Sequence, residues 1–511
     1  MFPERFNMYE YFLESNLEAG RGDKVAVYFR DEKYTYEQII KETNRVGNVL
    51  RELGVEIEDR VLMVLPDCPE FVATWFAITK LGAVITMVNP LLAPQDFDYY
   101  LDYTRAKVAV VEASVLERVE PAAKKARYLK NLLVVDRYVD VEHRYPSYSK
   151  LVPTAPDCLD TAPTSKDDIA IWLFTSGSTG QPKAAVHLQH DLPYNTECYP
   201  KHVLQMTEQD ITLGVPKLFF GYATGTNLLF PFRFGASTAL FYERSTPETV
   251  FAMIERYRPT VLTNVPTMIN AMLQLEGDYD LTSLRVCISA GEALPEELYR
   301  RWIKRFGVEI LDGIGSAELF HIYISNRFGE VRPGSLGRIV PGYEAQIVDA
   351  EGRVVPTGEI GTLRVRGDSA AICYWNAHEK SKATFAGDWV TSADLFRVDE
   401  EGYYWYAGRS DDMLKVGGIF VSPLEIENCL LQHPAVAECA VVGASDEHGL
   451  VKPKAFVVLR AGYEAAEGMI DELQQFAKQR MAPYKYPRLV EFVASLPKND
   501  RGKVDKKLLK G

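Results

Sequence analysis

The sequence lacks the features that mark membrane, secreted and nucleic-acid-binding proteins. None of its apolar runs reaches the roughly 18 residues that a membrane-spanning helix needs. The first residues, MFPERFNMYEYFLESN, contain no basic region followed by an apolar core, so we expect no secretory signal. The formal net charge is -13, whereas a nucleic-acid backbone is bound by a concentrated basic surface. We therefore expect a soluble cytoplasmic protein with no membrane and no nucleic-acid partner.

Cysteine is also scarce, and its spacing excludes a zinc site. The seven cysteines are odd in number and scattered, with no CxxC pair. We expect reduced, buried thiols at Cys68, Cys158, Cys198, Cys287, Cys373, Cys429 and Cys439. With 47% hydrophobic and 25% charged residues, the 511-residue chain has the composition of a globular protein built from several packed units.

The order of apolar runs predicts an α/β protein. Between residues 24 and 136 the runs VLMVLP, AVITMV, KVAVV and NLLVVD alternate with amphipathic stretches, which is typical of a buried parallel sheet. A second β-α set begins with IAIWLF and continues through VLTNV and LRVCISA. Residues 334–406 show short alternating strands with glycine-rich turns, which indicates an antiparallel or barrel-like piece. The last hundred residues form another small α/β unit.

One glycine- and hydroxyl-rich segment predicts a phosphate site. The segment TSGSTGQPK, residues 175–183, follows the strand-like run IAIWLF. Small residues let the backbone approach a polyphosphate, hydroxyls and amides donate hydrogen bonds to it, and Lys183 supplies charge. The segment is not a Walker loop, because GK followed by Ser or Thr is absent. A flexible surface turn is the alternative for such a run taken alone.

Further motifs follow in a fixed order over nearly the whole chain: SAGEALP, DGIGSAE, WVTSAD, GRSDDMLKVGG and PKNDRGKVDKKLL. Together with TSGSTGQPK they resemble the adenylate-forming superfamily of acyl-CoA ligases, luciferases and peptide-synthetase adenylation domains. The resemblance implies a large N-terminal domain at 1–410, with two β-α-layered subdomains and a β-barrel-like subdomain. It also implies a small mobile α+β domain at 411–511. ATP, coenzyme A, Mg²⁺ and a carboxylic acid are the implied ligands, and a homodimer stays open as an assembly.

The resemblance also assigns nucleotide-binding roles. Gly291 and Glu292 would form a wall for adenine, Glu318 would meet magnesium, and Asp394 and Arg409 would contact the ribose. The full implied nucleotide set is Thr175, Ser176, Gly177, Ser178, Thr179, Gly180, Lys183, Gly291, Glu292, Asp312, Gly313, Ser316, Ala317, Asp394 and Arg409. The chain departs from the family at Ala317, where Thr is usual, which leaves the α-phosphate contact to Ser316 or unmade. A second departure is Ala393, where the family prefers Gly.

The C-terminal motifs imply a two-step division of labour. Lys503, after Gly502 in the final loop, matches the catalytic lysine that bridges carboxylate and phosphate in adenylation. Asp411 matches the hinge about which the small domain rotates. That rotation would withdraw Lys503 and bring the coenzyme A-binding set Lys415, Gly417 and Gly418 to the site. A solvated charge cluster between domains is the alternative for the hinge segment taken alone.

Two aromatic segments, VPKLFFGYATGTNLLFPF and LFHIYISN, resemble the acyl pocket of bacterial benzoate-CoA ligases. Aromatic walls suit a flat, compact acyl group, although such runs are also typical of a core. The implied pocket set is Lys217, Phe220, Tyr222, Ala223, Gly315, His321 and Ile322. Lys217 lies either near the carboxylate entry or in solvent. His190 is either a gate or wall of the pocket, or a structural residue bridging two segments.

The leading hypothesis is therefore an AMP-forming aryl-CoA ligase acting on benzoate or a close analogue. One alternative is a stand-alone adenylation enzyme that loads an aryl or amino acid onto a carrier protein. Another is a coenzyme A ligase for an alicyclic or short aliphatic acid. A luciferase-like oxidation and a non-enzymatic binding module are smaller alternatives, and joint retention of Lys183, Glu318, Asp394, Arg409 and Lys503 disfavours the module.

Overall fold

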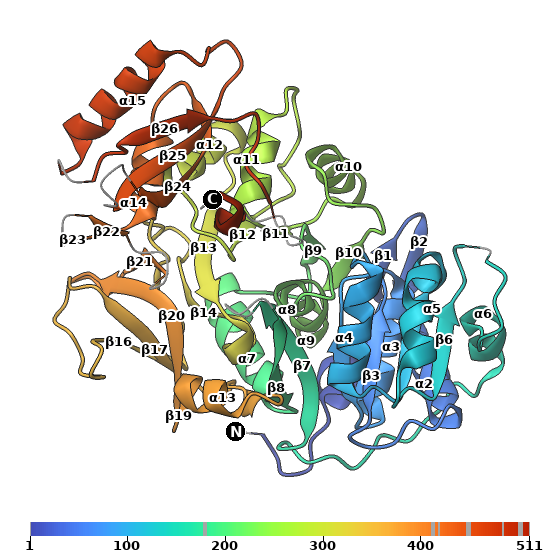
Figure 1. Ribbon diagram of the computed structural model, residues 1–511. Coiled ribbons are helices and arrows are strands. Elements are labelled where there is room, and N and C mark those ends of the chain that lie inside the picture. The colour runs from blue at the N-terminus through green and yellow to red at the C-terminus, as the bar shows by residue number, and fades with distance from the viewer. Residues whose placement is uncertain are drawn as a thin grey trace.

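The computed structural model describes residues 2–139, 141–176, 181–409, 414–416, 419–445, 451–482, 485–498 and 504–509. Within them the chain forms mixed and antiparallel sheets covered by helices, as an α/β architecture requires (Figure 1). None of the helices in these ranges is long and apolar enough to cross a bilayer. The expected fold class is confirmed.

The first sheet contains the predicted parallel strands. Its order is β18-β8-β7-β4-β3-β5-β6. The strands are β3 (Arg60–Val64), β4 (Val84–Met87), β5 (Val108–Glu112), β6 (Asn131–Val135), β7 (Ile169–Ser176), β8 (Pro182–Leu188) and β18 (Cys373–Tyr374). Helices α2 (Tyr36–Glu52), α3 (Pro69–Lys80), α4 (Pro94–Thr104) and α5 (Leu116–Lys125) flank them. Every residue of α3 is buried, because this helix is apolar almost all round and packs between other elements.

The second sheet is nine-stranded, in the order β15-β14-β13-β12-β11-β9-β10-β1-β2. Its strands are β1 (Val25–Phe29), β2 (Glu32–Thr35), β9 (Ile211–Gly214), β10 (Ser237–Leu240), β11 (Val261–Asn264), β12 (Val286–Ser289), β13 (Ile310–Gly315), β14 (Ile322–Ser325) and β15 (Arg338–Ile339). Helices α10 (Pro247–Tyr257), α11 (Pro266–Gln274) and α12 (Glu296–Phe306) connect its parallel strands. The helices α7 (Asp191–Tyr199), α8 (Gly221–Thr224) and α9 (Phe230–Phe234) precede β10.

Sheet membership differs from the sequence-based grouping at two strands. β7, expected to open the second set, pairs with β4 in the first sheet, where Ile171 lies opposite Ile85. β1, from the first part of the chain, pairs with β10 in the second sheet, where Val27 lies opposite Thr238. Apolar runs specify that a segment is a buried strand, but not which of two neighbouring sheets supplies its partner.

The antiparallel piece is confirmed as a third sheet of order β16-β17-β20-β19, with β21 paired to β20. Its strands are β16 (Glu344–Val348), β17 (Gly361–Arg366), β19 (Phe385–Ala386), β20 (Trp389–Val398) and β21 (Tyr404–Arg409), with helix α13 (His378–Thr384) before β19. In Figure 1 this sheet, in orange, lies below the C-terminal unit.

The C-terminal unit contains β22 (Leu414–Val416), β23 (Ile419–Val421), β24 (Val436–Ser445), β25 (Val451–Leu459), β26 (Leu489–Phe492), α14 (Pro423–Leu430) and α15 (Glu467–Arg480). Helix α14 packs against β21 of the third sheet. The expected domain boundary between residues 410 and 411 lies outside the described residues.

The cysteines correct one expectation. All seven are free thiols, and Cys68, Cys198, Cys287 and Cys429 are buried. Cys158 is exposed, however, while Cys373 and Cys439 are half-buried. Cys158 stands in the connecting segment between α6 (Tyr148–Leu151) and β7 rather than in a packed element, which explains its exposure.

Candidate active site

The antiparallel pair β7–β8 frames the predicted phosphate loop. Thr175 lies opposite Lys183 in this pair, and the strands close at Ser176 and Pro182. The loop residues Gly177, Ser178, Thr179 and Gly180, and the side chain of Ser176, lie outside the described residues. The Lys183 ammonium lies 3.4 Å from the centroid of the Tyr374 ring, a cation–π arrangement that leaves its positive charge intact.

Glu318 lies on the short 3-10 helix η6 (Ala317–Leu319), directly between β13 and β14. Its carboxylate accepts a hydrogen bond from the Tyr374 hydroxyl, and its carbonyl accepts one of 2.8 Å from the Ala371 amide. Tyr374 thus joins two predicted ATP-handling residues, although sequence reasoning missed it. The one sequence signal was its aromatic pair with Trp375, which reads equally well as core.

A buried histidine also contacts the backbone of η6. His187, on β8, hydrogen-bonds to Asp191 at 2.8 Å and, through Nε2, to the carbonyl of Ala317 at 2.7 Å. The side chains of His187 and Asp191 are 0% and 1% exposed. Sequence reasoning missed this pair as well, and its signal is the His–Asp spacing of four residues that follows the phosphate loop. Ser316 makes no side-chain cap of η6, so the backbone of Ala317 is anchored by His187 instead.

A strained turn separates the metal candidate from the acyl candidate. Phe320 has φ 68° and ψ −59°, and the His321 amide donates to the Leu319 carbonyl at 2.9 Å. These values define a γ-turn with positive φ, a rare and strained conformation for a bulky residue. Because the chain reverses over a single residue, Glu318 and His321 are held on different sides of one turn.

The predicted acyl residues Tyr222 and His321 lie together in an aromatic cluster. His321 Nε2 donates to the Tyr222 carbonyl at 2.9 Å, and the two rings are 5.3 Å apart. The rings of Phe230 and Tyr199 lie 4.7 and 5.6 Å from His321. Burial lowers the pKa of His321 to about 3, so the imidazole is neutral at physiological pH. This aromatic cluster is therefore uncharged.

The remaining acyl candidates lie on the same elements. Ala223 and Ile322 are buried, and Phe220 immediately precedes α8. Gly315 must be glycine, because a Cβ there would lie 2.5 Å from the His321 carbonyl oxygen across the β13–β14 pair. Gly313 is restricted in the same way, with Ile324 O at 2.6 Å from such a Cβ.

Lys217 is not a solvated lysine. Its ammonium donates to the Phe241 carbonyl at 2.8 Å and lies 3.3 Å from the centroid of the Phe241 ring. Burial lowers the pKa of Lys217 to about 8, while the Asp67 charge opposes that shift. Burial likewise raises the pKa of Asp67 to about 6, and its carboxylate accepts a 2.8 Å bond from the Leu218 amide.

The adenine-side candidates stand after β12. Gly291 has φ 90°, a conformation that favours glycine. The Glu292 carboxylate accepts from the Thr267 amide and hydroxyl at 3.1 and 2.7 Å, at the first turn of α11, where a negative charge is favourable. Asp312, on β13, is buried, and this burial raises its pKa to about 8.

The two ribose candidates are cross-strand neighbours. Asp394 on β20 lies opposite Arg409 on β21. The Tyr406 hydroxyl donates to Asp394 Oδ1 at 3.4 Å. The Arg409 side chain lies outside the described residues.

Most of the residues expected to act in the small domain lie outside the described part of the chain. Asp411, Gly417, Gly418 and Lys503 lie outside the described residues, and Lys415 is described only as backbone in β22. Their predicted roles stay predictions.

Magnesium fits the site through a single protein carboxylate. Among the described residues there is no cluster of three or more His, Cys, Asp or Glu side chains that could hold a metal. Mg²⁺ needs no such cage, because it is usually held by one or two carboxylates together with substrate phosphates and water. Glu318 supplies one such carboxylate, and it is half-buried. Tyr374 contacts both Glu318 and the Lys183 ammonium, so the two charged groups lie near each other.

The contacts of His190 support the structural alternative. It contacts Lys166 O at 2.9 Å and the carboxylates of Asp167, Asp191 and Asp368 at 3.4, 3.4 and 3.8 Å. Burial opposes its charge, but the hydrogen bond to Asp368 and the charge of Asp191 raise the pKa of His190 to about 9. It therefore ties three segments together.

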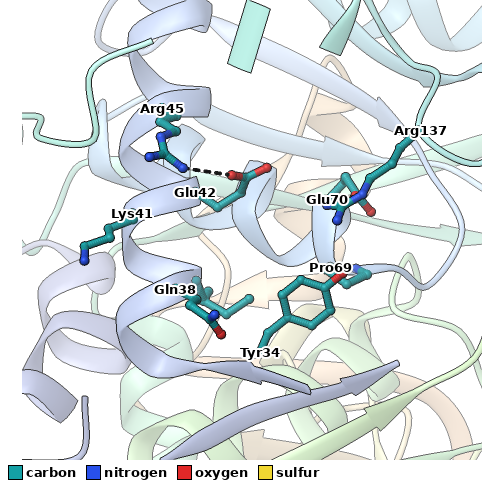
Figure 2. Close-up of a pocket in the computed structure, with 9 residues that line it drawn as sticks. Tyr34, Gln38, Lys41, Glu42, Arg45, Pro69, Glu70 and Arg137 are labelled. Carbon is teal, nitrogen blue, oxygen red and sulfur yellow. Dashed lines mark hydrogen bonds and ion pairs between the residues drawn. The ribbon is translucent and has the colours of Figure 1, made fainter. Parts of the chain in front are cut away.

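A pocket of 230 Å³ lies between α2, the start of α3 and Arg137 (Figure 2). It is lined by Tyr34, Gln38, Ile39, Lys41, Glu42, Arg45, Pro69, Glu70 and Arg137. None of the predicted site residues lines it. Its buried carboxylate, Glu70, is already engaged by Arg137 at 3.0 Å and by the Tyr138 hydroxyl at 3.1 Å.

Comparison with known proteins agrees with this arrangement. Residues 13–375 match the family described as AMP-binding enzyme, and residues 425–503 match the AMP-binding enzyme C-terminal domain. The chain therefore belongs to the AMP-binding enzymes, and the adenylate-forming superfamily expected from its motifs is confirmed.

Similarity to individual proteins extends over nearly the full length. A benzoate–CoA ligase of Thauera aromatica is 44% identical over 512 residues, covering 99% of this chain and 95% of that protein. The crystal structure of a benzoate CoA ligase from Burkholderia xenovorans LB400 is 40% identical, with a TM-score of 0.92 and coverage of 99% and 100%. An anthranilate CoA ligase crystallised with anthranoyl-AMP is 41% identical, with a TM-score of 0.94 and coverage of 99% and 97%.

Proposed function

We propose that this protein is an AMP-forming aryl-CoA ligase that converts benzoate or a close aromatic analogue, ATP and coenzyme A to aroyl-CoA, AMP and pyrophosphate. The observation that carries the proposal is the junction of two unlike surfaces at one turn. Glu318, linked through Tyr374 to Lys183, stands before Phe320, and neutral His321 with its aromatic neighbours stands after it. The full-length similarity to benzoate and anthranilate ligases supports the choice of an aromatic acid.

Adenylation needs positioning and charge stabilisation rather than covalent catalysis by the protein. The substrate carboxylate attacks the α-phosphorus, and negative charge gathers on the phosphate oxygens as pyrophosphate departs. Lys183 binds the leaving phosphates, and Glu318 holds magnesium, which when bound neutralises phosphate charge. Lys503 bridges the carboxylate and phosphate oxygens. Asp394 and Arg409 hold the ribose hydroxyls, while Gly291 and Glu292 bound the adenine.

In the second step the coenzyme A thiolate attacks the acyl carbon and the bond to AMP breaks, so that AMP leaves; Lys503 must first move out of the thiolate's path. We assign domain 1–410 as the fixed body and 411–511 as the small domain, which rotates about Asp411. Lys415, Gly417 and Gly418 then line the pantetheine path, where glycine leaves room for a narrow chain. A cytoplasmic homodimer is the assembly that we propose, and light scattering on the purified protein tests it by mass.

A pyrophosphate-release assay tests the substrate class. Aromatic, alicyclic and short aliphatic acids are compared, each with and without coenzyme A. We expect turnover with aromatic acids that depends on coenzyme A. Turnover of aliphatic acids alone would overturn the aryl assignment, and release that is indifferent to coenzyme A would favour loading of a carrier protein.

A further inference from the structure

Tyr374 contacts both of the charged residues that the proposed function assigns to magnesium and the leaving phosphates. Its hydroxyl donates to Glu318, and its ring centroid lies 3.4 Å from the Lys183 ammonium. The side chain is only 3% exposed, so it cannot swing freely. Tyr374 therefore contacts the Lys183 ammonium on β8 and the Glu318 carboxylate on η6.

The backbone around Tyr374 is fixed to the same two elements. Tyr374 lies opposite Ala185 in the β18–β8 pair, two residues along the strand from Lys183. The Ala371 amide, three residues earlier, donates to the Glu318 carbonyl at 2.8 Å. The Tyr374 amide donates to the Ser381 hydroxyl at 2.9 Å, which ties β18 to α13. Movement of Tyr374 would thus disturb Lys183 and Glu318 together.

From these contacts we infer that Tyr374 is a positioning residue for adenylation, which presets the Glu318 carboxylate for magnesium and the Lys183 ammonium for phosphate. The inference rests on the proposed function for the roles of Glu318 and Lys183. A neutral hydroxyl orients a carboxylate by engaging one oxygen, and it leaves the negative charge in place for a cation. An aromatic face likewise orients an ammonium without neutralising it.

A phenol ordinarily loses its proton only near pH 10, so the Tyr374 hydroxyl is a donor to Glu318 at neutral pH. A purely structural tyrosine would also satisfy its hydroxyl when buried. The two roles differ in one measurable respect, which is the concentration of magnesium that the reaction needs.

The test compares Tyr374→Phe, which keeps the ring over Lys183, with Tyr374→Leu, which removes both contacts. The control is Tyr103→Phe. The Tyr103 hydroxyl donates to the carbonyl of Trp375 at 2.6 Å and accepts from the amide of Ala184 at 3.3 Å, so it joins β8 to the residue after β18, and neither bond involves Glu318 or Lys183. Benzoate-dependent ATP–pyrophosphate exchange is measured against free Mg²⁺ and against MgATP.

We expect Tyr374→Phe to raise the half-saturating Mg²⁺ concentration about fivefold, with the rate at saturating Mg²⁺ within about twofold of the parent. Tyr374→Leu should also raise KM for MgATP about tenfold, because the ammonium loses its platform. Transfer from supplied benzoyl-adenylate to coenzyme A should be unchanged in both variants.

An Mg²⁺ dependence equal to that of Tyr103→Phe would overturn the inference, as would an equal loss of exchange and of acyl transfer. Either result leaves the proposed function intact when the parent enzyme is active. If the parent enzyme is inactive with every aromatic acid, the proposed function is wrong, and this inference fails with it.

Discussion

The proposed phosphate end and the proposed acyl end of the site share one strand–turn–strand segment, β13 to β14, yet they differ in electrostatic character. At the phosphate end, the charged groups of Glu318 and Lys183 are held by a tyrosine that leaves their charge intact. At the acyl end, burial favours neutral forms, with the pKa of His321 lowered to about 3 and that of Lys217 lowered to about 8. Neighbouring elements, rather than the shared segment, therefore set the chemistry of each end.

The two ends also differ in the hydrogen-bond partners of their buried histidines. His187 and His321 both donate to a backbone carbonyl, Ala317 O and Tyr222 O. His187 also has a carboxylate, Asp191, on its other nitrogen, whereas the Nδ1 of His321 is buried with no hydrogen-bond partner among the described residues. In the ranges described, the same residue type is therefore hydrogen-bonded on both ring nitrogens at one end and on a single nitrogen at the other.

The largest effect is expected from a substitution of Lys503. It tests whether the charge of this lysine is needed for adenylation and not for transfer to coenzyme A. Lys503→Ala should slow adenylation at least 100-fold, a loss of about 3 kcal/mol in transition-state stabilisation. Transfer of a supplied acyl-adenylate to coenzyme A should be spared. Pyrophosphate exchange and acyl transfer are measured separately, with the exposed Lys507→Ala as the control. Equal loss of both steps would refute the division of labour.

The His187–Asp191 pair tests whether the proposed phosphate end is supported by a buried hydrogen bond. His187→Ala should lower the free energy of unfolding by about 2 kcal/mol, because buried Asp191 would lose its hydrogen bond to His187 while keeping the Leu188 amide and the longer contact with His190. Urea denaturation followed by fluorescence measures the change. His202→Ala, at an exposed position, is the control and should change stability by less than about 0.5 kcal/mol. A loss below about 1 kcal/mol at His187 would mean that the pair contributes little.

Sequence reasoning predicted the fold class and the framework of this site because both depend on local patterns. The alternating runs specified the strands, and the segment 175–183 combined glycine, hydroxyls and Lys183 in a pattern that phosphate chemistry explains. Family motifs placed Glu318 and His321 within three residues of each other, and in the structure Glu318 lies on η6 while His321 follows the turn at Phe320.

The supporting contacts could not be predicted in the same way, because they join segments that are distant in sequence. Tyr374 lies 56 residues from Glu318, and His187 lies 130 residues from Ala317. Their partners depend on the placement of β18 beside β8 and of η6 over β7, and no periodicity encodes that placement. The positive φ of Phe320 was equally hidden, since a phenylalanine gives no turn signal.

His321 tests the neutrality of the acyl end. His321→Phe keeps an aromatic ring but removes the donor to the Tyr222 carbonyl, and we expect KM for the aromatic acid to rise about tenfold, equivalent to about 1.4 kcal/mol. Since the pKa of His321 is about 3, the imidazole is neutral throughout pH 6 to 8. The ratio of parent to variant kcat/KM should therefore be the same at pH 6 and pH 8. A ratio that changes across this range would show that His321 gains or loses a proton there.

The smallest effect is expected at Lys217, the one lysine among the proposed acyl residues. A lysine whose pKa is lowered to about 8 loses its proton as pH rises through that value, and its attraction for a carboxylate is lost with it. If Lys217 attracts the incoming acid, KM for benzoate should rise two- to threefold, roughly, between pH 7 and pH 9. Lys217→Met should show the higher KM at both pH values, whereas Lys201→Met, at an exposed lysine, should keep the pH dependence of the parent. A parent KM that is flat over this range would place Lys217 outside the path of the carboxylate and leave the acyl end without any working charge.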